Sequence, residues 1–233
     1  LASALQLIVL GALLEFYGLA QKKGPCPLVP AGVVSAFLLA LPFIFPDIPA
    51  GAALLGSLTV LGVWFLTRIT TLERLASFPS SLSLTFFGAV YVSFTLNHIL
   101  ALRRDFGPRA IFFFLAVIFS GDTGAFLIGS LFGRHKMTPL ASPRKSWEGS
   151  GGGLLFAALG ALAGRWLFFP ELGATRSVLY GLALHVVAQL SDPLESLFKR
   201  AAGVKDSSRL FPGHGGLLDR VDSLILSTPL YYY

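Results

Sequence analysis

Charged side chains are scarce in this chain. They make up 13% of its 233 residues, whereas soluble domains carry about 25%. Hydrophobic residues make up 54%, and the mean hydropathy is +0.72. So little charge cannot cover the surface of a soluble domain, which excludes that class and predicts an integral membrane protein.

Cysteine is nearly absent. Cys26 is the single cysteine, which excludes an intrachain disulfide, and one thiol cannot form a cysteine metal cluster. A signal-peptide pattern is also missing, because residues 1–20 have neither a basic start nor a small-residue cleavage site. We interpret them as a first transmembrane segment. The chain begins at Leu1 rather than Met, so we expect that its true N-terminus is not included.

Long apolar runs are abundant instead. A transmembrane helix needs about 20 apolar residues, and runs such as Ile111 to Leu115 lack the alternation of barrel strands. Because lipid leaves backbone groups to be satisfied within their own segment, helices follow. The sequence predicts an all-α, polytopic helical membrane bundle with about eight or nine transmembrane helices, some broken or short. The candidate spans are residues 1–20, 29–46, 51–67, 82–102, 110–130, 150–169, 177–190 and 216–233.

Basic residues are divided unevenly between the predicted loops, and cytoplasmic loops carry the excess of Lys and Arg. One side, with loops 21–28, 68–81, 131–149 and 191–215, holds twelve, and the other holds five. We therefore expect a multi-pass protein of the cell inner (plasma) membrane whose polar motifs face the cytoplasm. The twelve are Lys22, Lys23, Arg68, Arg74, Arg134, Lys136, Arg144, Lys145, Lys199, Arg200, Lys205 and Arg209, and the five are Arg103, Arg104, Arg109, Arg165 and Arg176.

The net charge of +6 suits anionic head groups or phosphorylated substrates. No nucleic acid partner is expected, because no soluble basic domain is available to bind it. We predict that residues 1–110 form a transmembrane scaffold. Residues 111–233 then supply the remaining helices and the cytoplasmic loops with the catalytic site.

Polar residues gather first around Asp122 and then in the block 133–149. Asp122 either lies within a membrane helix, where a carboxylate indicates function, or caps a helix that follows Phe119. The second block reads either as an ordinary positive loop or, with Trp147 and the glycines after it, as a ligand site. The glycines suit tight helix packing or, alternatively, a flexible linker.

A third group surrounds Pro193. The residue before a proline avoids helical geometry, so a helix is expected to break at Asp192 and restart at Pro193. Asp192 and Glu195 would then form a capping box. Alternatively, Asp192, Glu195 and Lys199 share one helix face as part of a site. Three other polar residues are expected to be hydrogen-bonded packing residues: Asn97, His98 and His185.

The segment Ser196–Asp222 concentrates basic side chains, one histidine and three aspartates in a chain that is otherwise largely apolar. Asp219 and Asp222 are three apart on one helix face and, with Asp192, would give the oxygen ligands that Mg²⁺ prefers. Its lysines can neutralise phosphates, and its glycines leave room for a ligand. A salt-bridged cytoplasmic loop is the alternative.

This segment resembles the signature of the phosphatidate cytidylyltransferase (CDP-diacylglycerol synthase) family. The blocks around Asp122, Arg134 and Lys145 are similar to the family too, so the resemblance covers about residues 120–223. The family usually has Gly-Asp-Leu where this chain has Ser191-Asp192-Pro193. The fixed signature positions are Ser196, Lys199, Arg200, Lys205, Asp206, His214, Gly215, Gly216, Asp219, Arg220 and Asp222.

The resemblance implies a Mg²⁺-dependent nucleotidyltransferase of phospholipid biosynthesis, which converts CTP and phosphatidic acid into CDP-diacylglycerol and pyrophosphate. It implies metal ligation by Asp192, Asp219 and Asp222, with a second metal ion as a further option. His214 is assigned to a phosphate hydrogen bond or to proton transfer. The remaining catalytic residues are Lys199, Lys205 and Arg220, and the substrate-binding residues are Asp122, Ser142, Lys145, Trp147, Glu195 and Arg200.

Two other functions remain alternatives at this stage. Intramembrane carboxylates and a broken helix also suit a transporter or channel, although the charge lies mostly in loops. Another CTP-dependent lipid cytidylyltransferase or kinase is the second alternative. A small bundle with short spans is also compatible with a homodimer.

Overall fold

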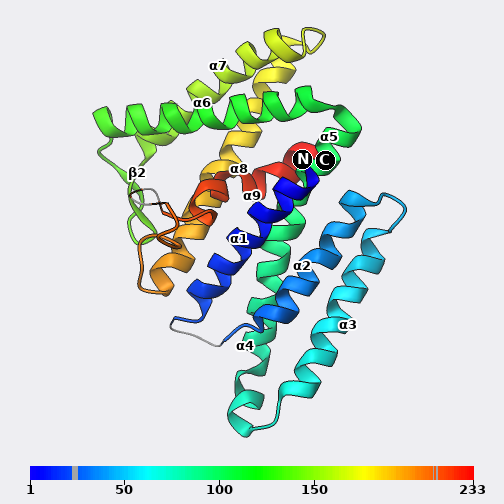
Figure 1. The fold of residues 1–233 in the computed structure, drawn as a ribbon. Helices are drawn as coiled ribbons and strands as arrows, with labels where there is room; N and C mark the ends of the chain where they lie inside the picture. Colours follow the sequence, from blue (N-terminus) through cyan, green and yellow to red (C-terminus); the bar gives the residue numbers. More distant parts are fainter. Residues whose placement is uncertain (23–25, 212, 214) are drawn as a thin grey trace. The chain divides into compact units, whose positions relative to one another are not determined.

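The computed structural model describes residues 1–22, 26–211, 213 and 215–233, and it is almost entirely helical (Figure 1). This confirms the predicted all-α polytopic membrane fold. A short antiparallel hairpin is the exception. The elements are α1 (Ala2–Ala20), α2 (Val29–Ile44), α3 (Ala50–Arg68), α4 (Leu72–Gly88), the π-helical η1 (Ala89–Phe94), α5 (Thr95–Phe106), α6 (Pro108–Phe132), β1 (Lys136–Thr138), β2 (Ser142–Ser146), α7 (Trp147–Phe168), α8 (Ala174–Ala201) and α9 (Leu218–Tyr232).

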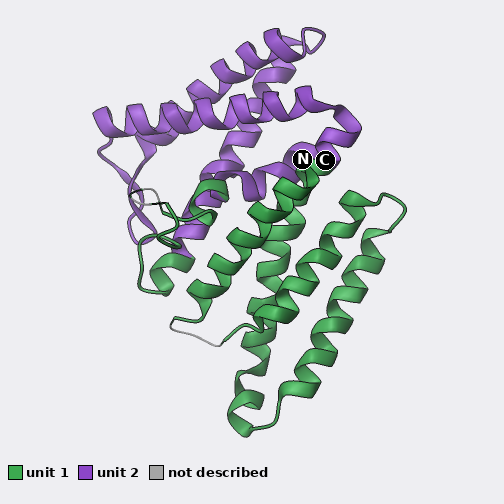
Figure 2. Ribbon diagram, viewed as in Figure 1, with its two compact units in different colours: residues 1–100, 198–221 green, residues 101–197, 222–233 purple. Residues whose placement is uncertain are grey.

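The chain divides into two compact units, coloured separately in Figure 2. Unit 1 contains residues 1–100 and 198–221, and unit 2 contains residues 101–197 and 222–233. Most of the signature segment therefore packs with the N-terminal helices. This division reflects packing, so the functional division predicted at residue 110 stays a prediction.

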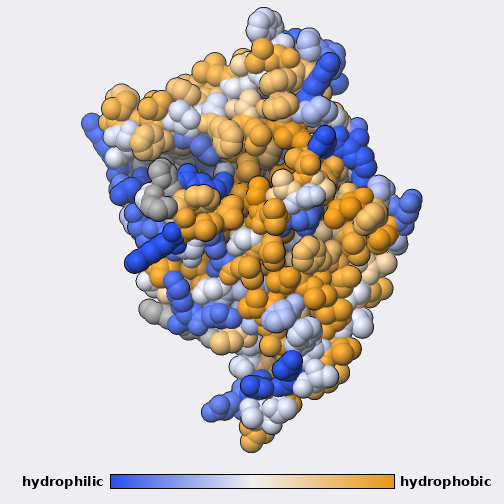
Figure 3. Space-filling view, viewed as in Figure 1, coloured by the Kyte–Doolittle hydropathy of each residue, from blue (hydrophilic) through white to orange (hydrophobic). Residues whose placement is uncertain are grey.

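Among the described residues, five helical segments are long and apolar enough to cross a membrane. They agree with predicted spans, and the shorter α2 is apolar as well. Large apolar side chains are exposed on them, for example Leu66 at 81% and Phe126 at 73%, and hydrophobic residues cover much of the face seen in Figure 3. Lipid contact explains this exposure. The five segments are Ala2–Ala20, Ala50–Arg68, Leu72–Phe106, Pro108–Phe132 and Trp147–Phe168.

In unit 1, one continuous helical segment replaces a predicted loop. The span expected at 82–102 begins at Leu72, so most of the loop expected at 68–81 is α4. Thr71 caps this helix, because its hydroxyl accepts from the Arg74 amide at 3.3 Å. Tyr17 of α1 is fully buried and donates to the Thr85 carbonyl at 2.6 Å, which ties α1 to α4.

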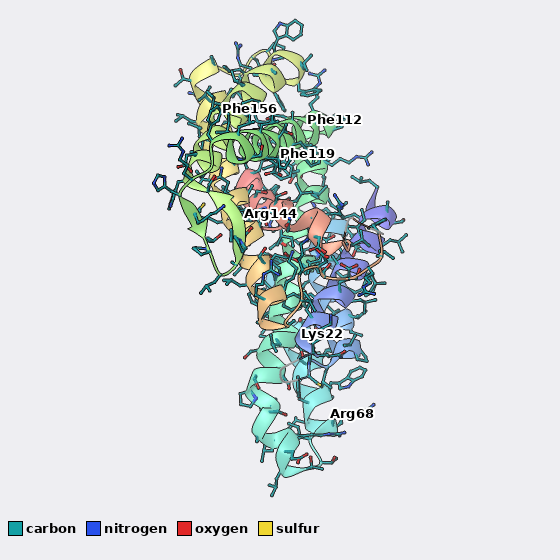
Figure 4. The ribbon with its side chains drawn as sticks, turned by 90° about the vertical axis from the view of Figure 1, so that its left-hand side faces the viewer. Lys22, Arg68, Phe112, Phe119, Arg144 and Phe156 are labelled. Carbon is teal, nitrogen blue, oxygen red and sulfur yellow. The ribbon has the colours of Figure 1, made fainter. Side chains whose placement is uncertain are left out.

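In unit 2, α6 and α7 pack through glycines. Cβ atoms built on Gly152 or Gly124 would lie 2.4 Å from side-chain atoms of Ile128 or Phe156. Figure 4 shows Phe156 on α7, Phe112 and Phe119 on α6, and Arg144 on β2. The glycine run is therefore a helix-packing surface, and the flexible-linker alternative is wrong.

The helix break predicted at Asp192 is also wrong. Helix α8 runs without interruption from Ala174 to Ala201 with Pro193 inside it. Proline removes the amide that would donate to the carbonyl four residues earlier, which belongs to Gln189. The Lys145 ammonium donates to that carbonyl instead, at 3.5 Å. This replacement donor and the burial of Pro193 let the helix continue, so Asp192 and Glu195 do not cap a new one.

Candidate functional site

In unit 1, the signature residues Lys199 and Asp219 form a nearly buried ion pair. The Lys199 Nζ atom lies 2.6 Å from Asp219 Oδ1, and the two side chains are 9% and 12% exposed. The other carboxylate oxygen, Oδ2, accepts from the amides of Ser207 and Gly216, both at 2.8 Å. The Asp219 carboxylate therefore links the end of α8 to the start of α9.

These donors decide the charge of Asp219. Burial would raise the pKa of its carboxyl, but hydrogen bonds from Lys199, Gly216 and Ser207 outweigh burial and lower the pKa below its ordinary value. Gly215, with a φ of +79°, makes the turn that brings the Gly216 amide to this oxygen. The result is a fixed anion beside a buried ammonium.

In unit 2, a second lysine–aspartate pair joins the hairpin to α8. Lys145 Nζ lies 2.7 Å from Asp192 Oδ2. Asp122 of α6 interacts electrostatically with both of these residues and accepts a hydrogen bond from Ser223. Because α6 continues to Phe132, Asp122 lies inside a helix, and the alternative that it caps a new helix is wrong.

The hairpin positions further predicted residues. Ser142 begins β2 opposite Thr138, and the exposed Trp147 begins α7, where its amide donates to the His135 carbonyl at 2.9 Å. Glu148 accepts from the His135 Nδ1 atom at 2.6 Å. The block therefore forms a strand pair that holds Lys145.

The remaining predicted residues differ in exposure. Glu195 is buried, at 1% exposure, whereas Lys205 and Arg220 are exposed. Arg200 is exposed and donates to the Val204 carbonyl at 3.2 Å. The prediction for His214 lies outside the described residues. Asp222 is half-buried; it accepts from the Ser223 amide at 2.7 Å, and its own carbonyl accepts from the Ser191 hydroxyl.

The predicted metal ligands do not form one group within a unit. Asp219 belongs to unit 1, whereas Asp192 and Asp222 belong to unit 2. Across the described parts of the chain, no three His, Cys, Asp or Glu side chains are arranged to hold a metal ion. Metal ligation therefore stays a prediction.

Sequence reasoning missed Glu15 of α1 as a site residue. Its carboxylate accepts from the hydroxyls of Ser207 and Ser208 and from the amides of Leu217 and Leu218. The available signal was a lone carboxylate inside an apolar span, which is costly unless it has partners.

His185 behaves differently from its prediction. It is fully buried among glycines, where a Cβ on Gly121 would lie 2.3 Å from its Nδ1 atom. Neither ring nitrogen has a hydrogen-bond partner among the described residues, so His185 packs but is not hydrogen-bonded. Asn97 is bonded as expected, because it donates to the Ser93 carbonyl at 2.8 Å.

Comparison with known proteins gives consistent results. Relatives named phosphatidate cytidylyltransferase occur in Synechocystis sp. (45% identity over 122 residues), Staphylococcus epidermidis (42% over 127) and Haemophilus influenzae (40% over 133). These matches cover 51%, 54% and 54% of this chain and 40%, 49% and 46% of the relatives, so the chain spans about half of their length. A sequence model described as the cytidylyltransferase family matches residues 1–233. The chain therefore belongs to the cytidylyltransferase family.

Proposed function

We propose that the protein transfers the cytidylyl group of CTP to phosphatidic acid, giving CDP-diacylglycerol and pyrophosphate. Family membership and the names of the relatives support this reaction class. The observation that carries the proposal is the Lys199–Asp219 pair, which joins two parts of the signature in one nearly buried cluster. A buried ammonium held in place by a carboxylate suits the binding of a phosphate group.

In the proposed reaction, an oxygen of the phosphatidate phosphate attacks the α-phosphorus of CTP. A new phosphorus–oxygen bond forms as the bond between the α-phosphorus and the bridging oxygen to the β-phosphate breaks, and pyrophosphate leaves. A phosphate monoester is largely ionised near neutral pH, so a strong base is not required. The chain must mainly position the two phosphates and neutralise their charge.

Lys199 and Lys145 are the cations that we assign to this task. Each is already oriented by an aspartate, at 2.6 and 2.7 Å respectively. Their ammonium groups therefore do not have to be ordered when a phosphate arrives. Lys205 and Arg220 are exposed and are proposed to meet the more outward phosphates.

Mg²⁺ dependence forms part of the proposal. Mg²⁺ in phosphate-transfer sites needs only one or two carboxylates, because substrate oxygens and waters complete its shell. The neighbouring carboxylates of Asp122 and Asp192 in unit 2 fit this requirement, and Asp222 of the same unit is a further candidate. When bound, the ion would neutralise phosphate charge and assist the departure of pyrophosphate.

We also propose that the protein lies in the cell inner membrane with this site facing the cytoplasm. The apolar helices support a multi-pass membrane protein. The twelve-to-five division of basic residues supports the orientation. A lipid substrate would explain why these polar clusters lie in a protein with such apolar helices.

Radiolabelled CTP tests the reaction directly. The purified protein in mixed lipid–detergent micelles would receive labelled CTP with or without phosphatidic acid and Mg²⁺. We expect lipid-soluble label only when both are present. No lipid-soluble product, together with no CTP binding or consumption, would refute the proposed function.

Asp219→Asn tests the site itself. The amide cannot neutralise the Lys199 ammonium, so we expect turnover to fall by about a hundredfold or more. Asp105→Asn is the matched control, since Asp105 pairs with Arg104 outside the signature and should keep wild-type turnover. Activity retained by Asp219→Asn would remove Asp219 from the site. If this variant does not fold, Asp192→Asn tests the corresponding pair of unit 2.

A further inference from the structure

Glu15 binds the signature segment from the first helix. Its Oε1 atom accepts from the Ser208 hydroxyl at 2.7 Å and the Leu217 amide at 3.0 Å. Its Oε2 atom accepts from the Ser207 hydroxyl and the Leu218 amide, both at 2.8 Å. One carboxylate therefore lies within hydrogen-bond distance of four donors that are about 200 residues away in the sequence.

These donors belong to two different pieces of the segment. Leu217 and Leu218 are at the start of α9, where backbone amides have no partner within the helix. Ser207 and Ser208 follow the end of α8. Gly216 packs closely against both Glu15 and Ser207, because a Cβ there would come 2.2 Å from an oxygen of each. Glu15 thus fixes both ends of the turn that carries the signature glycines.

Ser207 links Glu15 to Asp219. Its hydroxyl oxygen lies 2.8 Å from Glu15 Oε2 and 2.7 Å from Asp219 Oδ2. A serine hydroxyl has one hydrogen to donate, so the two carboxylates compete for it. When Ser207 donates to Glu15, Asp219 Oδ2 loses one of its donors and is freer to accept a positively charged partner.

We propose that Glu15 is a positioning residue of the cytidylyltransferase site. Its carboxylate holds Ser207, Ser208, Leu217 and Leu218 beside the Lys199–Asp219 pair, and it sets how tightly Ser207 holds Asp219. The effect of Glu15 on CTP transfer rests on the proposed function, whereas its effect on the order of the segment does not. Glu15 thereby gives a role in the site to a transmembrane helix outside the signature.

Glu15→Gln and Glu15→Asp separate this role from general stability. In Glu15→Gln, an amide NH₂ replaces one acceptor oxygen and faces donors, so the segment should loosen. Glu15→Asp keeps the negative charge, so the segment should remain more ordered in this variant than in Glu15→Gln. Gln6→Leu is the control, because Gln6 lies on the same helix and donates to Asn97 at 2.6 Å, away from the segment.

The first readout is hydrogen exchange by mass spectrometry, which does not depend on activity. We expect exchange of residues 207–219 in Glu15→Gln to accelerate about tenfold or more. Exchange in α2 and α3 should stay unchanged, and saturating CTP should restore protection. The second readout is kinetic: KM for CTP should rise while kcat at saturating CTP is largely kept, because bound nucleotide re-forms the segment.

Two results would overturn the proposal. The first is wild-type exchange of residues 207–219 in Glu15→Gln. The second is equal acceleration throughout unit 1 with unchanged KM, which would show a purely structural role. A wild-type protein without transfer activity would refute the proposed function and the effect of Glu15 on CTP transfer. The exchange comparison would still decide whether Glu15 holds the segment.

Discussion

Three consecutive glycines near the start of α7 should differ in how substitution by alanine changes the stability of the protein. One variant should be more stable than the wild type and two should be less stable. An alanine Cβ at position 151 would meet no atom within 4 Å. At position 152 it would lie 2.4 Å from the Ile128 Cβ atom, and at position 153 it would lie 2.4 Å from His185 Nε2. The helix backbone at all three positions is the same, so the neighbours alone decide the difference.

The expected magnitudes follow from two opposing effects. Alanine favours a helix over glycine by about 1 kcal/mol, so Gly151→Ala should stabilise by about that amount. Carbon atoms prefer a separation of about 3.5–4.0 Å, so a contact at 2.4 Å forces α6 and α7 apart. Ile128 Cβ is fixed to the backbone and cannot rotate away. Overpacking costs about 1–3 kcal/mol, so after the helix gain of about 1 kcal/mol Gly152→Ala should be destabilised by up to about 2 kcal/mol.

Thermal unfolding in detergent, followed by circular dichroism, measures these differences. For a chain of this size, about 1 kcal/mol corresponds to about 2–4 °C in Tm. Gly151→Ala should therefore melt a few degrees above the wild type, and Gly152→Ala and Gly153→Ala below it. If all three variants melted together above the wild type, the close contact between α6 and α7 would be refuted.

Two further predictions concern the Asp219 cluster. Gly216→Ala should abolish transfer and accelerate exchange around Ser207, because its Cβ would lie 2.2 Å from Glu15 and Ser207 oxygens; normal activity would contradict the Glu15 contact. Lys199→Met should raise the pKa of Asp219, which hydrogen bonding keeps below its ordinary value. A lowered carboxyl pKa stabilises the fold above the pKa of the unfolded chain and loses this effect as the pH falls through the folded value. The acid limb of the Tm–pH curve should therefore move to higher pH in Lys199→Met. A Lys199→Met curve equal to that of the wild type would contradict the prediction.

Much of the candidate site could be predicted from residue type and spacing. The signature identified Lys199 and Asp219, and the structure places them 2.6 Å apart. The polar block 133–149 identified Lys145, which pairs with Asp192. Both pairs join residues whose charges are costly to bury alone, so a sequence that keeps them in an apolar protein implies that they have partners.

The wrong prediction of a helix break came from a pattern of neighbouring residues alone. The helix break at Asp192 was inferred from the preferences of a proline and its neighbour, which are strong in an isolated chain. In the folded unit, Lys145 from the hairpin donates to the Gln189 carbonyl that Pro193 leaves without a partner. A donor from another element thereby removes the reason for the break.

By itself, the sequence determined the membrane class and the positions of most helices, and it predicted the residues of the candidate site, because composition and spacing act along the chain. Only the tertiary structure decided the role of Glu15, which meets Ser207 across 192 positions of sequence. It likewise decided that the glycines of α7 pack against α6. No local pattern reports such contacts, since their energy depends on which distant groups the fold brings within hydrogen-bond or van der Waals distance.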